Sequence, residues 1–164
     1  MANLCLAAVQ AVWTYLLASD GINAALADIA ARDSVELTEL SDRTVRMQNV
    51  PPDVADQNEP VLYPSLYVYC DRIDNRRREK FTRFSGPILL VVEVRVSGER
   101  FIGLEALLAR YVEAATRVLE ARHGTWTEEL AYDGAYEVQF REIRLGGRNF
   151  LQAARIEVEV QAHA

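Results

Sequence analysis

Residues 87–124 read PILLVVEVRVSGERFIGLEALLARYVEAATRVLEARHG, and this stretch decides the fold of the 164-residue chain. Apolar residues alternate through residues 88–97, while Glu93, Arg95 and Ser97 make the other positions polar towards the end of the run. Because side chains alternate between the two faces of a strand, the pattern predicts a strand with one buried face. That face comprises Ile88, Leu90, Val92, Val94 and Val96.

The second half of the stretch predicts a long amphipathic helix that begins at about Gly103 and ends at His123 and Gly124. Its apolar residues recur with the helical period: Leu104, Leu108, Tyr111, Ala115, Val118 and Leu119. Charged side chains occupy the opposite side: Arg110, Glu113, Arg117 and Glu120. We therefore expect the apolar stripe of this helix to cover the buried face of the strand.

The composition indicates one domain over residues 1–164. Half of the residues are hydrophobic, which is enough for a core that buries roughly 70% of the surface of the unfolded chain. The net charge is −6. This charge argues against general affinity for nucleic acid or for an anionic membrane, because both require a basic excess.

Two helices are predicted ahead of this stretch, one over residues 4–18 and one from Asp20, a candidate N-cap, to about Arg32. Residues 41–64 then show no periodicity and contain four of the five prolines. A connection of this length inside a compact domain is commonly a binding loop or disordered. We therefore expect one long irregular loop at about 41–64.

Three more strands are predicted by alternation over residues 65–71, 135–144 and 150–161, the last two joined by a glycine turn. This order of elements predicts an α+β fold. We expect a two-layer sandwich, with a four-stranded, mostly antiparallel sheet and helices packed on one face. The predicted core comprises Leu66, Val68, Leu90, Val92, Val94, Leu104, Leu108, Tyr111, Val118, Phe140, Ile156 and Val158.

The second face of the predicted sheet mixes tyrosines with charges of both signs. Its positions include Tyr67, Tyr69, Glu93, Arg95, Glu137, Gln139, Arg141, Arg155, Glu157 and Glu159. Three uses of such a face remain open: simple solvation, contact between subunits, or the lining of a channel. The candidate interface residues on it are Glu93, Arg95, Glu157 and Glu159.

Positive charge is concentrated in residues 71–85, where six bases and three acids give a local charge of +3 and leave −9 on the remainder. Further candidate interface residues are Arg72, Arg76, Arg77, Arg78, Lys80, Phe81, Arg83 and Phe84. Bases mixed with aromatic side chains also occur in nucleic-acid sites, and arginine-rich loops are often solvated. We expect a contact with a protein partner and keep both alternatives.

The sequence contains no recognisable catalytic or metal-binding constellation. His123 and His163 neighbour no cysteine or serine in a nucleophile motif, and their spacing to acids and thiols matches no metal site. Gly146 and Gly147 join two strands, whereas a phosphate-binding loop opens a helix. We therefore expect no enzymatic activity, no cofactor and no metal.

The cysteines and the first apolar run favour a soluble intracellular protein. Cys5 and Cys70 lie in apolar contexts, which is typical of buried reduced thiols rather than of a disulfide or metal pair. No Lys or Arg precedes the run at residues 4–18, Gln10 interrupts it, and it is too short to span a bilayer. We expect no contact with a membrane.

The order of these elements resembles that of the tail terminator and tail-to-head joining (tail completion) proteins of long-tailed bacteriophages. The shared elements are N-terminal helices, Tyr67-Val68-Tyr69, a basic loop, Val91-Val92-Glu93-Val94-Arg95-Val96, a helix from about Gly103 and a final hairpin. The resemblance covers most of the chain from Leu4 to Val160 and rests on element order and size. The long loop at 41–64 departs from the simplest version of this fold.

The resemblance implies a structural virion protein, assembled in the host cytoplasm and located at the junction of tail and head. Proteins of this family form hexameric rings that cap the tail tube. The implied partners are further copies of the chain, the tail tube protein and the head-tail connector protein. DNA would pass through the channel without specific binding, because a mostly acidic wall repels phosphates. The basic segment would meet an acidic surface of the next subunit and help to close the ring.

Two other functions remain open at this point. One is a head-completion or connector component of the same particle. The other is a small nucleic-acid-binding module that uses the basic loop at residues 72–84. Size separates the ring from the module, because a hexamer would have six times the 18.5 kDa mass of the chain, whereas a simple binding module would run as a monomer or dimer.

Overall fold

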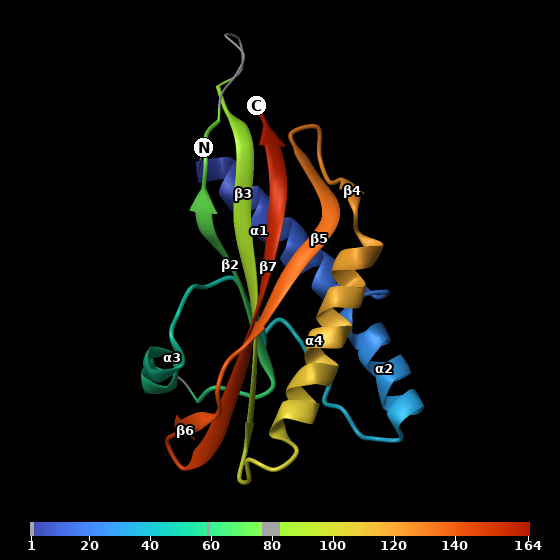
Figure 1. Cartoon of the computed structure of the whole chain (residues 1–164), viewed down its shortest axis with the longest axis vertical. Helices are drawn as coiled ribbons and strands as arrows, with labels where there is room; N and C mark the ends of the chain where they lie inside the picture. Colours follow the sequence, from blue (N-terminus) through green and yellow to red (C-terminus); the bar gives the residue numbers. More distant parts are fainter. Residues whose placement is uncertain (1, 59, 77–82) are drawn as a thin grey trace.

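The computed structural model describes residues 2–58, 60–76 and 83–164, and these residues confirm the α+β class (Figure 1). The helices are α1 (Ala2–Leu17), α2 (Ile22–Asp33), α3 (Pro52–Asn58) and α4 (Leu104–Ala121). The strands are β1 (Val45–Arg46), β2 (Ser65–Ile73), β3 (Ser85–Gly98), β4 (Gly124–Thr125), β5 (Leu130–Phe140), β6 (Arg144–Gly146) and β7 (Asn149–His163).

The strands form a single curled sheet with the order β1-β2-β3-β7-β5-β4, and β6 pairs with β7. The pair β1–β2 is parallel, and the other pairs are antiparallel. The longest ladder joins β3 to β7 over 14 positions, from Ser85 opposite His163 to Gly98 opposite Phe150. This ladder forms the centre of the sheet.

The sheet contains more strands than the four that the sequence predicted. The four predicted strands correspond to β2, β3, β5 and β7, and three short strands extend them. Strands β1 and β4 have two residues each and β6 has three. Segments this short contain too few alternating positions to be recognised in a sequence, because tertiary pairing alone makes them strands.

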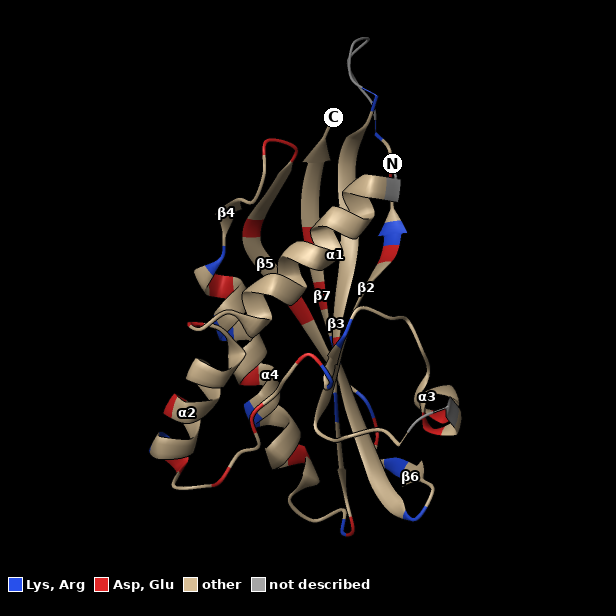
Figure 2. Ribbon diagram, turned by 180° about the vertical axis from the view of Figure 1, so that it is seen from behind, with Lys and Arg blue, Asp and Glu red and all other residues tan. Residues whose placement is uncertain are grey.

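The helices do not form one simple layer. Helices α1 and α4 pack on the same face of the sheet, with α1 lying across the strands in Figure 2. Helix α2 packs chiefly against α4 and so lies outside that layer. Helix α3 lies apart from the others, beside β2 (Figure 1). The predicted two-layer sandwich therefore describes the centre of the molecule and omits the positions of α2 and α3.

The predicted core is confirmed at every position except one. Eleven of the 12 residues are buried, whereas Phe140 is 47% exposed. Phe140 lies opposite Ala154 of β7, and beyond Tyr132 no strand among the described residues pairs with the outer side of β5. Its ring therefore has a neighbouring strand on one side only, which sequence alternation does not reveal.

The prediction of Asp20 as an N-cap is wrong. The N-cap of α2 is Gly21, which makes no side-chain capping bond. A Cβ atom at Gly21 would lie 2.4 Å from the carbonyl oxygen of Leu16, so only glycine fits this close approach of the two helices. Asp20 instead pairs with Arg122 at the end of α4, at 2.6 Å.

No single helix among the described residues is long and apolar enough to cross a membrane. The segment Asn3–Leu17 and helix α2 reach that length and composition only together, and they are bent by 42°. Val12, Leu16 and Ile29 from these two helices are fully buried in the core.

An ion cluster joins α2 to α4. Asp33 accepts hydrogen bonds from Arg32 at 2.7 Å and from Arg110 at 2.8 Å, and Arg32 also donates to Glu113 at 2.7 Å. The bonds from Arg32 and then Arg110 lower the pKa of Asp33 from 3.8 to about 2. The carboxylate form of Asp33 therefore favours the folded state.

We expect this contribution to stability to disappear in acid. Because the pKa of Asp33 is lower in the folded chain than in the unfolded chain, the contribution is fully present above about pH 4 and is lost as the pH falls through about 2. Thermal unfolding of Asp33→Asn should therefore differ most from the wild type at neutral pH, with the gap closing towards pH 2. Asp28→Asn, an exposed change on the same helix, is the control. A gap independent of pH would contradict the assignment.

The face assignment of α4 is tested by two neighbouring substitutions. Leu108 is fully buried and Ala109 is exposed. Leu108→Asp places an unpaired charge in the core and should lower the free energy of unfolding by more than about 3 kcal/mol. Ala109→Asp should cost less than about 1 kcal/mol. Denaturant titration measures both, and similar losses would show that the buried face is wrongly assigned.

Candidate interaction site on the second face of the sheet

The second face of the sheet is the side turned away from α1 and α4. Strand β2 places Tyr67 and Tyr69 on it, and the two tyrosines form a small buried cluster with Val91 of β3. The register sets Tyr67 opposite Glu93, and Glu93 opposite Arg155 of β7. Aromatic and charged side chains from three adjacent strands therefore lie side by side.

Arg95 is the central buried group of this face, with 1% of its surface exposed. Its guanidinium group lies over the ring of Tyr67, 3.9 Å from the ring centre. Its Nε atom donates to Glu93 at 2.6 Å, and its Nη2 atom donates to the carbonyl oxygen of Val50. Arg95 therefore holds the segment that precedes α3 against the sheet.

Tyr69 completes this network. Its hydroxyl donates to the second carboxylate oxygen of Glu93 at 3.3 Å. Burial, and then the charge of Glu93, raise the pKa of Tyr69 to about 12. The hydroxyl therefore stays protonated at neutral pH and remains a donor to the carboxylate.

The exposed part of the second face carries charges of both signs, with a slight excess of carboxylates. Arg155 pairs with Asp71 at 2.8 Å and with Glu157 at 3.0 Å. Glu137 lies directly opposite Glu157 in the ladder, and Glu159 is exposed. Two further guanidinium groups lie near them: Arg72 is opposite Leu89, which is itself opposite Glu159, and Arg141 lines a hollow with Glu93 and Arg155. The region therefore carries only a slight excess of negative charge. No group of three or more His, Cys, Asp or Glu residues suited to a metal ion occurs in the described part of the chain.

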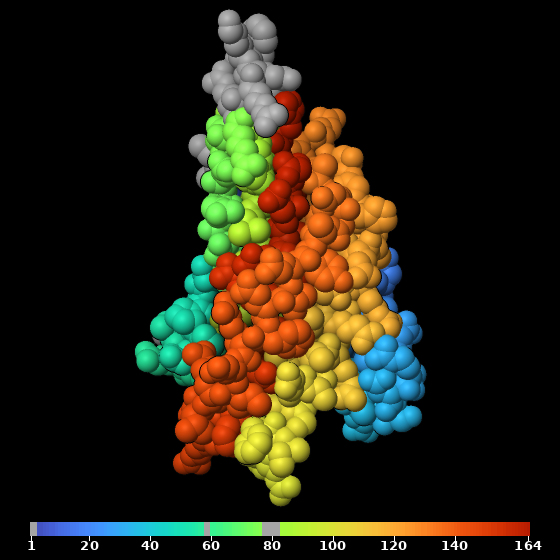
Figure 3. Space-filling view, viewed as in Figure 1, coloured from blue at the N-terminus to red at the C-terminus, as the bar shows by residue number. Residues whose placement is uncertain are grey.

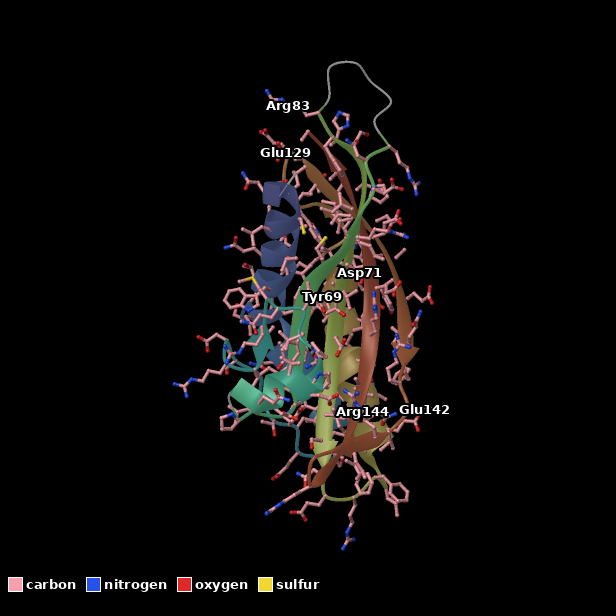
Figure 4. The ribbon with its side chains drawn as sticks, turned by 90° about the vertical axis from the view of Figure 1, so that its left-hand side faces the viewer. Tyr69, Asp71, Arg83, Glu129, Glu142 and Arg144 are labelled. Carbon is pink, nitrogen blue, oxygen red and sulfur yellow. The ribbon has the colours of Figure 1, made fainter. Side chains whose placement is uncertain are left out.

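The basic segment begins beside this charged region and runs towards one end of the molecule: Asp71 pairs with Arg155, and Arg72 is opposite Leu89, which is itself opposite Glu159. Arg72 and Arg83 are exposed, and exposed Arg76 pairs with Asp74 at 2.8 Å. Arg83 lies at the same end of the molecule as Glu129 in Figure 4, whereas Tyr69 and Asp71 lie midway along it. The predicted interface residues that fall outside the described part of the chain are Arg77, Arg78, Lys80 and Phe81.

Two predicted interface residues are not available to a partner. Phe84 is 2% exposed and belongs to the core. Its backbone exchanges hydrogen bonds with Ala164, and this pairing fixes the residue beside the end of β7. Arg95 is buried by the segment before α3, as described above. The sequence could not distinguish these side chains from exposed ones, because distant segments cover both.

A cavity of about 690 Å³ beside β2 was not predicted from the sequence. It lies between residues 43–55 and 60–62 and the start of β2, and its lining includes Arg43, Arg46, Val54, Leu62, Ser65 and Tyr67. The segment was predicted to be irregular, yet α3 begins at Pro52. Proline is favoured at the first position of a helix, so Pro51-Pro52 was the signal that the prediction missed.

The two cysteines are free thiols and are half-buried. Burial, and then a hydrogen bond with the thiol of Cys5, raise the pKa of Cys70 to about 12. Cys70 is therefore protonated at neutral pH and is a poor nucleophile.

No model of a known protein family matches this chain, and no curated protein matches its sequence. The geometry of the sheet and the order of the elements are therefore the basis for an inference about function.

We expect Arg95→Met to destabilise the fold by about 3–5 kcal/mol, because it leaves Glu93 as an unpaired charge in a covered site. Adding Glu93→Gln should recover part of the loss. Arg144→Met, at an exposed arginine of β6, is the matched control and should cost less than about 1 kcal/mol. Denaturant titration measures the free energy of unfolding of the three variants. Equal losses for Arg95→Met and Arg144→Met would show that the buried network contributes nothing.

Proposed function

We propose that the protein is a structural subunit of a long-tailed phage particle, which forms a ring that caps the tail tube and joins it to the head connector. The resemblance in element order suggests this role. The structural observation that supports it is that the sheet has two open edges and an acidic exposed face. The role requires binding and assembly but no catalysis.

The open edges belong to β2 and β5. Strand β1 pairs only with Leu66 and Tyr67 of β2, and β4 pairs only with Ala131 and Tyr132 of β5. Along the rest of both strands, no strand from the described ranges covers the outer side. Such edges present unpaired backbone N–H and C=O groups, which a second chain readily pairs with.

The positions of the edges favour a ring. They lie on opposite sides of one sheet, so contact between β2 of one copy and β5 of the next joins two different surfaces. Contacts of this heterologous kind repeat from copy to copy and close into a ring when the rotation permits. The open part of β5 carries exposed Asp133 and Glu137, and exposed Glu142 follows it, which suits contact with a basic segment.

A ring built in this way would place the second faces of all copies on one wall. Figure 3 shows this face, with β5 and β7 across its centre and β2 at its left-hand margin. Its exposed part carries an excess of carboxylates, from Asp71 and Glu137 to Glu159. An acidic wall would let DNA pass without binding, because like charges repel.

We expect the purified protein to assemble to a mass near six times 18.5 kDa, measured by light scattering after size exclusion. Changing Arg76, Arg77 and Arg78 to Glu should weaken assembly and leave the circular dichroism spectrum unchanged. The matched control changes Arg100, Arg144 and Arg148 to Glu, which are exposed arginines near the opposite end of the sheet. Both variants lower the net charge equally.

In the particle, loss of the protein should release tails of abnormal length or tails that never join heads. Two results would contradict the proposal: a protein that stays monomeric at high concentration, and imaged particles that place it away from the tail axis. Unchanged assembly of the Arg76, Arg77 and Arg78 variant would assign the basic segment to the solvated surface.

A further inference from the structure

We propose that Cys5 of α1 and Cys70 of β2 form a redox modification site, which a small disulfide such as oxidised glutathione converts into an intramolecular disulfide. Both cysteines are free thiols, so the structure is the reduced form. The inference is independent of ring formation. It is carried by the placement of the two cysteines on facing surfaces of α1 and the sheet, by the contact between their thiols, and by their partial exposure.

Cys5 lies on the side of α1 that faces the sheet. Cys5, Val9 and Val12 are spaced at the helical period, so their side chains share one side of the helix. Val9 and Val12 are buried in the core. Helix α1 packs more extensively against β2 than against any other element. The Cys5 side chain is therefore directed towards the interface between α1 and the sheet.

Cys70 lies on the face of β2 that α1 covers. Alternation places Leu66, Val68 and Cys70 on the same face of the strand, and Leu66 and Val68 are fully buried. Cys70 is opposite Leu90 of β3, which is also fully buried, and its side chain packs against the core. Helix α1 crosses this face of the sheet in Figure 2. The two thiols therefore enter the same interface from opposite sides.

The two thiols are in contact. A hydrogen bond links them, so the sulfur atoms are neighbours before any reaction, and a disulfide requires them to approach to about 2.05 Å. Both residues are half-buried, which leaves them within reach of a small reagent from solvent. The sequence contains no third cysteine, so no other thiol of the chain competes for the bond.

The reaction is thiol–disulfide exchange in two steps. The Cys5 thiolate attacks one sulfur of oxidised glutathione, breaks its S–S bond and displaces one glutathione thiolate. The Cys70 sulfur then attacks the Cys5 sulfur of the mixed disulfide and displaces the second. Two electrons pass from the cysteines to glutathione, and the two thiol protons end on the two reduced glutathione molecules. The first attack falls to Cys5 because burial raises the pKa of Cys70 to about 12, which leaves little thiolate there.

The bond would act as a covalent clamp between α1 and the sheet. It would close a loop from residue 5 to residue 70, which contains α2, β1 and α3. Closing a long loop removes conformational freedom from the unfolded chain, so the disulfide stabilises the folded state. The oxidised form should therefore be more stable than the reduced form.

The test treats the full-length protein with oxidised glutathione and follows intact mass, free thiols and thermal unfolding. The mass should fall by two hydrogen atoms per chain, and both thiols should become unreactive towards a thiol reagent. The melting temperature should rise by about 5 °C or more. Dithiothreitol should reverse all three changes. A gel without reductant should show single chains.

Three variants test the placement of the thiols. Cys70→Ser should stop at a mixed disulfide with one glutathione at Cys5, whereas Cys5→Ser should react about tenfold more slowly. The double variant Cys5→Ser with Leu6→Cys is the matched control, because it moves the thiol by one position to a side chain that is 59% exposed. It should take up glutathione without forming a bond to Cys70. None of the three variants should gain melting temperature.

Folding itself should promote the bond. In glutathione buffers, the equilibrium constant for oxidation should be about tenfold or more larger for the folded protein than for the same chain unfolded in urea, because folding holds the two thiols together.

Five outcomes would overturn the proposal: folded chains that keep both thiols free, chains that carry two glutathione molecules and no internal bond, disulfides between chains, a lower melting temperature after oxidation, or equal bond formation by the moved thiol. Sizing of the same samples reports the ring separately, so failure of one proposal is distinguishable from failure of the other.

Discussion

The structure depends on the long antiparallel ladder between β3 and β7. This ladder pairs 14 consecutive positions, and alternation along it separates two kinds of side chain. Most apolar positions of both strands point to one face, where α1 and α4 cover them. Most charged positions point to the other face, which they share with Leu89 and Val91. One register therefore sets both the core and the surface available for binding, and a shift of one residue would exchange them.

The charged side chains of the second face fall into two groups that differ in burial. Near α3, Arg95 is enclosed by Tyr67, Glu93 and the carbonyl oxygen of Val50. Further along β7, Arg155 pairs with Asp71 and Glu157 in a more exposed setting. The first group is enclosed beside the cavity that Val50 and Tyr67 line, whereas the second lies on a surface with a slight excess of carboxylates. The same sheet face thus offers two chemically different regions.

The proposed ring uses the more exposed of these two regions. The ring relies on the open edges of β2 and β5 and on the acidic surface between them.

The sequence by itself determined the α+β class, the four main strands, the apolar face of α4 and 11 of the 12 predicted core residues. These features follow from local periodicity, which each segment carries without reference to the others. Only the tertiary structure decided the short strands, the exposure of Phe140, the burial of Phe84 and Arg95, and the cavity at Ser65. The physical reason is that each of these depends on which distant segment covers a side chain, and local periodicity carries no information about contacts between segments far apart in the sequence.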